Sequence, residues 1–409
     1  MIVLSPTPAQ NSGTDPGNSH KRLRFSAELR GRVEGFTGLG FAPGNEDVYY
    51  LHRMRLGIQW EAAPWLRLAA GVQDARAPGR RKPIPATAGN PVDLFETYAE
   101  IGRPGQGWNL RAGRQRLSYG AERLVGPSEW SNVARLFDAC RISYERGKAR
   151  LDGFVSALVR PDPSRFDGFR REIQLHGIYA SVETHPRRVV EPYLLWKRVR
   201  GENGAQDIWT AGVRAAGPLP HRLDYELEAA AQMGRLAATP VRSWASSSTL
   251  GRRLGAAESS PRIFIEYAQA AGDRDPYDGV QTTFDQLFPA NHIRYGIADR
   301  IGWRNMRATR IGWELQPAGA WTLVFEYHSF WLVSRRDFLY GADGAPLLRN
   351  PSASSSHVHQ ELDLHGNVRL TESWSLSFGY ARVFPGCFLK DSSPGRPVNF
   401  AFLAWRLRL

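Results

Sequence analysis

The segment that decides the fold reads KRLRFSAELRGRVE at residues 21–34. From Leu23 through Phe25 to Val33, apolar or small side chains occupy every second position, and charged or hydroxyl side chains occupy the positions between them. A period of two places these two sets on opposite faces of a β-strand, whereas a helix would scatter them around its circumference. The segment therefore predicts a strand with one apolar face and one charged face.

The same alternation recurs along the whole chain. It is clearest at residues 221–233, 357–371 and 373–380, where apolar residues again alternate with charged or hydroxyl residues. With weaker examples included, we expect about eighteen strands, an even number. The weaker examples are residues 49–60, 65–74, 94–102, 108–116, 136–145, 149–159, 171–183, 188–199, 207–216, 242–253, 261–270, 303–315, 321–331 and 398–409.

The connections between these strands alternate in length. Short connections, such as 61–64 and 103–107, alternate along the chain with long ones, such as 75–93, 117–135 and 271–302. Barrels of the bacterial outer membrane have short periplasmic turns and longer extracellular loops. The pattern predicts an all-β fold, a closed antiparallel transmembrane β-barrel, with both chain ends on the periplasmic side.

Composition fits a barrel better than a soluble β protein. The 409 residues are 42% hydrophobic, and none of their segments is an apolar run long enough for a membrane-spanning helix. A soluble sandwich would have to bury the charged strand faces, which is costly for unpaired groups, whereas a water-filled lumen would not. We expect residues 21–409 to form one outer-membrane barrel domain. Residues 1–20, which lack the basic and apolar regions of a signal peptide, should be a flexible segment.

The charge is strongly positive, at +13, and only five of the 53 basic residues are lysine. A genomic bias toward arginine is one explanation. The other is functional, because guanidinium groups bind carboxylates and phosphates through two parallel hydrogen bonds, and rings of basic side chains select anions in pores.

We expect the charged strand faces to form a pore constriction in which acidic side chains hold the arginines. Closure of the barrel should also bring Arg406 and Arg408 beside Arg30 and Arg32, because the first and last strands become neighbours. The constriction residues predicted in this way are Arg30, Arg32, Arg53, Arg55 and Arg111, with Glu96, Glu100 and Asp138 as acidic partners.

The chain contains none of the common hydrolase, metalloprotease or nucleotide-binding motifs in its required context. We therefore expect no catalytic residue, no metal and no cofactor. His357, His359 and His365 share one strand face and are an alternative metal site, but lumen-exposed histidines are the preferred interpretation. An acidic loop at 273–278 resembles a calcium loop only loosely, because the later ligand positions are missing.

Residues 110–126 read LRAGRQRLSYGAERLVG and are followed by Trp130, Asn132 and Asp138. This stretch resembles the G-R-Q-x-L … R-L-V-G … W-x-N-x-x-R-x-F-D segment of the alginate-export family of outer-membrane barrels. A second block, at 267–296, is also similar to that family. The resemblance covers roughly residues 22 to 409 and implies an 18-stranded barrel with an arginine-rich constriction that passes a polyuronate.

The resemblance adds Arg114, Arg141 and Arg300 to the expected substrate path. It also has gaps: the link at 371–373 is too short for the periplasmic insertion of the alginate exporter, and Ser377 and Gly379 stand where a basic pair is expected.

The expected function is thus an outer-membrane pore for export or diffusion of an anionic polysaccharide or of small anions. A general porin without a polymer substrate is the alternative, and an enzyme with a site at the barrel rim is a third class. Expected partners are the anion, outer-membrane lipid and candidate periplasmic secretion proteins, but no nucleic acid.

Overall fold

The computed structural model describes residues 23–81, 84–168, 171–201, 204–317 and 319–409. Each of the expected strands is present, with ends that differ from the prediction by only a few residues. The strands of the main sheet are β1 (Leu23–Thr37), β2 (Asp47–Ala63), β3 (Leu66–Arg76), β4 (Asn90–Leu94), β5 (Thr97–Arg103), β6 (Gln106–Gln115), β7 (Phe137–Arg146), β8 (Ala149–Leu158), β9 (Ile173–His185), β10 (Arg188–Val199), β11 (Gln206–Leu219), β12 (Leu223–Leu236), β13 (Thr239–Arg253), β14 (Arg262–Ala270), β15 (Met306–Leu315), β16 (Trp321–Leu332), β19 (His357–Arg369), β20 (Trp374–Pro385) and β21 (Val398–Arg408).

The remaining elements are short. A hairpin of β17 (Leu339–Tyr340) and β18 (Pro346–Leu348) lies between β16 and β19, and α1 (Cys387–Ser392) lies between β20 and β21. Two 3-10 turns occupy Leu39–Phe41 and Pro220–Arg222. In the described part of the chain, no helix has the length and apolar character needed to cross a membrane.

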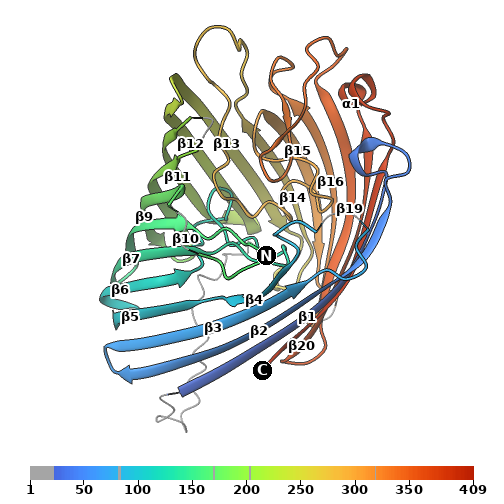
Figure 1. Ribbon diagram of the computed structural model, residues 1–409. Coiled ribbons are helices and arrows are strands. Elements are labelled where there is room, and N and C mark those ends of the chain that lie inside the picture. Colours follow the sequence, from blue (N-terminus) through green and yellow to red (C-terminus); the bar gives the residue numbers. More distant parts are fainter. Residues whose placement is uncertain (1–22, 82–83, 169–170, 202–203, 318) are drawn as a thin grey trace.

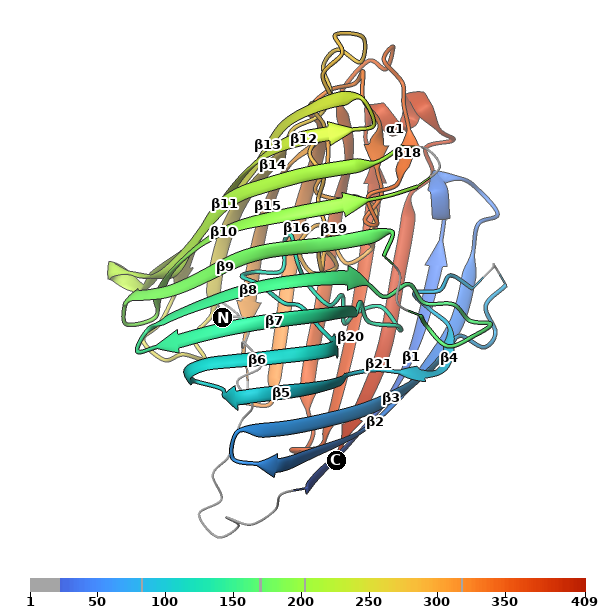
Figure 2. The same cartoon turned by 60° about the vertical axis from the view of Figure 1, so that its left-hand side comes forward.

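The main sheet closes on itself (Figures 1 and 2), because β1 pairs with both β2 and β21 in antiparallel fashion. β4 and β5 both pair with β3 and together fill one place in the wall, so the 19 sheet strands make a ring of 18. The predicted closed antiparallel barrel is confirmed. The register also puts Arg30 opposite Arg406, as closure was expected to do.

The two faces of the wall differ as the alternation predicted. Apolar side chains on the outer face are exposed, among them Phe25 at 72%, which suits contact with lipid tails rather than water. Tryptophans at strand ends, such as Trp60, Trp65 and Trp108, are exposed on the outside, as in the aromatic girdles of barrels. The C-terminal residue lies beside the first strand at the end of the barrel with the short turns, since the Ala27 amide of β1 donates to the Leu409 carbonyl at 3.1 Å.

The lumen is not simply filled with water, and on this point the sequence-based expectation is wrong. The loops 117–136 and 271–305 fold into the barrel (Figures 1 and 2). Val125 and Phe288, one from each loop, form a parallel bridge there. Apolar loop residues pack there against inward-facing wall residues such as Phe137 and Leu175. Long loops that turn inward supply apolar partners, so an apolar core forms inside the ring.

A test of the lipid-facing assignment compares two positions on the outer face of β12. Ala229 lies near the middle of the strand, and Met233 lies closer to its end. Ala229→Arg should destabilise the barrel by about 2–4 kcal/mol, and Met233→Arg by clearly less, because the cost of a lipid-facing charge falls toward the interface. Equilibrium unfolding in liposomes measures both. Equal effects of the two substitutions would contradict the assignment.

Candidate channel constriction

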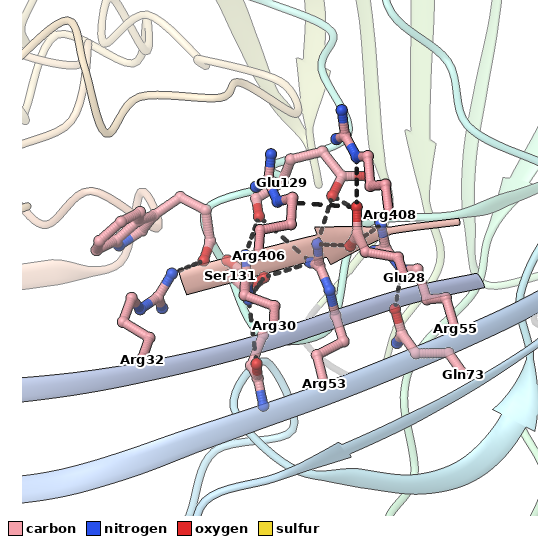
Figure 3. Close-up of polar contacts among 12 residues, drawn as sticks. Glu28, Arg30, Arg32, Arg53, Arg55, Gln73, Glu129, Ser131, Arg406 and Arg408 are labelled. Atoms are coloured by element: carbon pink, nitrogen blue, oxygen red, sulfur yellow. Dashed lines mark hydrogen bonds and ion pairs between the residues drawn. The ribbon is translucent and has the colours of Figure 1, made fainter. Parts of the chain in front are cut away.

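Three strands at the closing seam bring arginines side by side. Arg30 of β1 is opposite Arg53 of β2 on one side and Arg406 of β21 on the other. Like charges directly opposite each other in a sheet repel, so this row needs acidic partners. Glu28 supplies one, with Oε1 2.6 Å from Arg53 Nη2 and Oε2 3.1 Å from Arg408 Nε (Figure 3).

The second acidic partner, Glu129, comes from the inward loop 117–136. Its Oε2 lies 2.9 Å from Arg55 Nη1 and 3.3 Å from Arg53 Nη2, and its Oε1 lies 2.8 Å from Arg116 Nη1. Burial opposes ionisation of Glu129, but Arg55, Arg53 and Arg116 outweigh it and hold its pKa well below its usual range. Glu129 is therefore a fixed negative charge.

The backbone of the same loop binds the remaining arginines of the seam. Arg30 donates to the Glu129 carbonyl at 2.8 Å and to the Ser131 carbonyl at 3.0 Å. Arg32 donates to the Trp130 carbonyl at 2.6 Å, and its guanidinium lies 3.7 Å from the centre of the Trp130 ring. These contacts clamp residues 129–132 against the wall and leave Arg30, Arg32 and Arg53 almost completely buried.

Asn132 fixes the end of this clamp. Its Nδ2 donates to the carbonyls of His52, Arg76 and Ala88, at 2.9, 3.1 and 2.9 Å. Its Oδ1 accepts from Arg30 at 3.0 Å. One amide side chain therefore ties the loop to β1, β2, β3 and the connection after β3.

At its other end, the loop carries a cation to the far side of the ring. Arg123 Nη2 lies 2.9 Å from Glu266 Oε1 of β14 and 3.7 Å from Glu226 Oε1 of β12, and Arg123 Nη1 donates to Tyr295 Oη at 3.1 Å. Burial disfavours the charge on Arg123, but Glu266 and Glu226 prevail and raise its pKa well above the usual value. Loop 117–136 thus crosses the lumen. Its Glu129 binds the arginines of the closing seam, the basic wall, and its Arg123 binds the carboxylates of β12 and β14, the acidic wall.

Other predicted residues lie along the lumen but outside this clamp. Arg111 binds Glu100 at 2.7 Å and is opposite Arg141 on β7. Glu96 accepts from Arg116 at 2.8 Å. Arg300 sits in the second inward loop, 5.5 Å from the Phe36 ring.

Arg114 lies on the other face of the wall from Arg111 and Arg141. It binds Asp138 at 2.9 Å, and register pairs these two residues across β6 and β7. Alternation puts both on the face of exposed Cys140, opposite to Arg111 and Arg141. Nearby, burial and Asp93 raise the pKa of Asp167 to about 6. The structure thus separates Arg114 and Asp138 from the seam.

Sequence reasoning missed Glu129, Arg116 and Arg123. All three lie in or beside the loop 117–136, and strand alternation carries no information about a loop that turns inward. The only available signal was the similarity of residues 110–141 to a known family, which marked the segment without showing which walls it contacts.

A closed ring of 18 antiparallel strands with an apolar outer face and a charged, partly filled interior is the architecture of outer-membrane channel barrels. The fold is similar to Pseudomonas aeruginosa OpdO (13% identity, 95% and 97% of the two chains, TM-score 0.64) and to OccK1 (OpdK) from the same organism (10%, 94% and 98%, 0.65). The chain belongs to the alginate export family, whose model matches residues 21–402. A comparison with curated proteins gives no match.

Fold and family together place the protein in the bacterial outer membrane, where it forms a pore. They are those of channels rather than of enzymes.

Proposed function

We propose that this pore conducts anions, as a route for export or diffusion of an anionic polysaccharide or of small anions. The observation that carries the proposal is the charge of the closing seam. There, the carboxylates of Glu28 and Glu129 face a larger number of guanidinium groups, which leaves a net positive charge on this wall. The arginines in contact with the two carboxylates are Arg53, Arg55, Arg116, Arg406 and Arg408.

The arginines differ in how well a passing anion can reach them. Arg53 is buried beneath the loop, whereas the side chains of Arg406 and Arg408 are 35% and 64% exposed. The exposed pair, at the end with the short turns, is suited to attract an anion into the lumen. The buried arginines contribute a positive electrostatic potential deeper in the lumen. Conduction needs binding weak enough to release the ion, and partly neutralised arginines meet that need.

The proposed path keeps the predicted residues that face the lumen and leaves Arg114 and Asp138 aside. These path residues are Arg30, Arg32, Arg53, Arg55, Arg111, Arg141 and Arg300, with Glu96 and Glu100 as acidic partners. Residues 129–132 are bound to the seam by Arg30, Arg32 and Asn132, so a bulky uronate polymer would need this segment to move further than a small anion would. The clamped loop therefore favours small anions at rest and supports a general anion porin as the second candidate.

The test is ion selectivity in planar bilayers. Wild-type channels should prefer anions, and the preference should weaken as the screening length falls from about 10 Å at 0.1 M salt to about 3 Å at 1 M. The double variant Arg406→Glu/Arg408→Glu should lose most of the preference, because it reverses the accessible charge. Arg160→Glu/Arg165→Glu, which changes the same charge in the exposed connection after β8, is the matched control.

Cation-selective wild-type channels would rule out the proposal. Added polyuronate separates the two substrates: block of small-ion current that disappears in the double variant supports a polymer path, and unimpeded current supports small anions.

A further inference from the structure

β16 and β19 turn both carboxylates and imidazoles toward the interior of the barrel. In register, Glu326 is opposite Asp363 and His328 is opposite Glu361, and all four side chains are buried. The second inward loop covers them, since the Ile297 amide donates to Asp363 Oδ2 at 3.1 Å. Carboxylates and imidazoles thus gather in a buried part of the lumen, and only β20 separates β19 from the seam strand β21.

The central contacts have the spacing of metal ligands. His328 Nε2 lies 3.3 Å from Glu326 Oε2 and 3.4 Å from Asp363 Oδ2. A neutral imidazole nitrogen has one hydrogen or one lone pair, so it satisfies at most one of these oxygens, and both distances exceed the usual N–H···O range of about 2.7–3.2 Å. In a tetrahedral zinc site with bonds of about 2.0–2.2 Å, neighbouring ligand atoms are about 3.4 Å apart.

A second observation is independent of these distances. Asp363 Oδ1, Glu361 Oε2 and both ring nitrogens of His359 are buried and have no hydrogen-bond partner. Arg310 compensates one charge, because its Nε donates to Glu326 Oε1 at 3.1 Å. Buried carboxylates without a cation are costly, and a divalent ion among them would remove that cost.

We propose that Glu326, His328 and Asp363 bind a divalent transition-metal ion, for which zinc is the best match. Imidazole and carboxylate ligands suit zinc, and the three ligand atoms lie within 4.8 Å of one another. Arg310 holds the carboxylate of Glu326 from behind, as groups around a metal centre do. The proposal replaces the sequence-based expectation that the chain holds no metal.

His365 is the candidate fourth ligand. Its Nε2 lies 3.7 Å from Glu326 Oε2 and has no hydrogen-bond partner. Its side chain is 20% exposed, whereas those of Glu326 and His328 are 1% exposed. Because His365 lies on the short-turn side of Asp363 along β19, it offers the ion a way in from that end of the barrel. The bound ion would tie β16, β19 and the second inward loop together.

The experiment uses the full chain without a histidine tag, folded in detergent, stripped with a chelator and then dialysed against zinc chloride. Elemental analysis should find one zinc per chain, and the melting temperature should rise with added zinc. His328→Gln and Asp363→Asn should each lose the stoichiometric zinc and the temperature shift. Cobalt(II) in place of zinc should give the visible absorption of a tetrahedral site.

His357→Gln is the matched control, because His357 is on the same strand but outside the proposed ligand set, and it should bind zinc like the wild type. Absence of zinc from the wild type, or binding that survives in both His328→Gln and Asp363→Asn, would overturn the proposal. The zinc readout is independent of ion selectivity, so the fate of the proposed channel function leaves this test intact.

Discussion

Arg123→Met is expected to destabilise the protein by about 3–5 kcal/mol, the usual cost of removing one partner from a buried ion pair. Arg123 is fully buried and is the cation that faces Glu266 and Glu226 from the loop. Methionine fills much of the same space but leaves these carboxylates without that partner. Arg294 and Arg310 remain close to them, so the effect should be at the lower end of the range.

Equilibrium unfolding in urea, followed by tryptophan fluorescence, measures this loss. Arg165→Met is the control, since Arg165 forms an exposed pair with Asp162 and such pairs contribute at most about 1 kcal/mol. The double variant Arg123→Met/Glu266→Gln should recover part of the stability, because it removes the charge left behind. A loss for Arg123→Met no greater than that for the control would mean that the loop is not anchored to the acidic wall.

Glu129→Gln is expected to release the loop from the basic wall and to enlarge the pore. The substitution removes the charge that compensates Arg53, Arg55 and Arg116, at a cost to the docked loop of about 3 kcal/mol. This corresponds to a shift of about 100-fold from docked toward undocked loop. Single-channel recordings should show larger and more frequently fluctuating conductance. In the wild type, docking should persist in mildly acidic solution, because the depressed pKa of Glu129 keeps the carboxylate charged until the pH falls through that value.

Glu46→Gln, which removes an exposed loop carboxylate, serves as the control and should leave the conductance unchanged. Identical recordings from Glu129→Gln and Glu46→Gln would show that residues 129–132 do not limit the pore. Since Glu129→Gln also makes the lumen more positive, anion preference should not decrease. A decrease would argue against the assignment of the seam as the selective element.

Most of the wall was predictable because strand alternation is local. The alternation at residues 221–233 predicted β12, and the predicted inner and outer faces agree with burial along the strand. Short connections make strands that follow each other in sequence neighbours in the sheet. Closure of the barrel then places Arg406 of the last strand opposite Arg30 of the first. Arg114, which was expected from the family resemblance, departs from this alternation. It is three positions from Arg111, so strand geometry alone puts the two on opposite faces.

By itself, the amino-acid sequence determined the barrel: the period of two, the alternating link lengths and the arginine-rich faces are all properties of neighbouring residues. Only the tertiary structure decided which wall charges the inward loop meets. Arg30 and the Glu129 carbonyl are 99 positions apart, and Arg123 reaches Glu266 from across the ring. The physical reason is that the inward loop is held by ion pairs of Arg123 and Glu129 with opposite walls of the barrel. Those walls exist only after strands distant in sequence have closed around it.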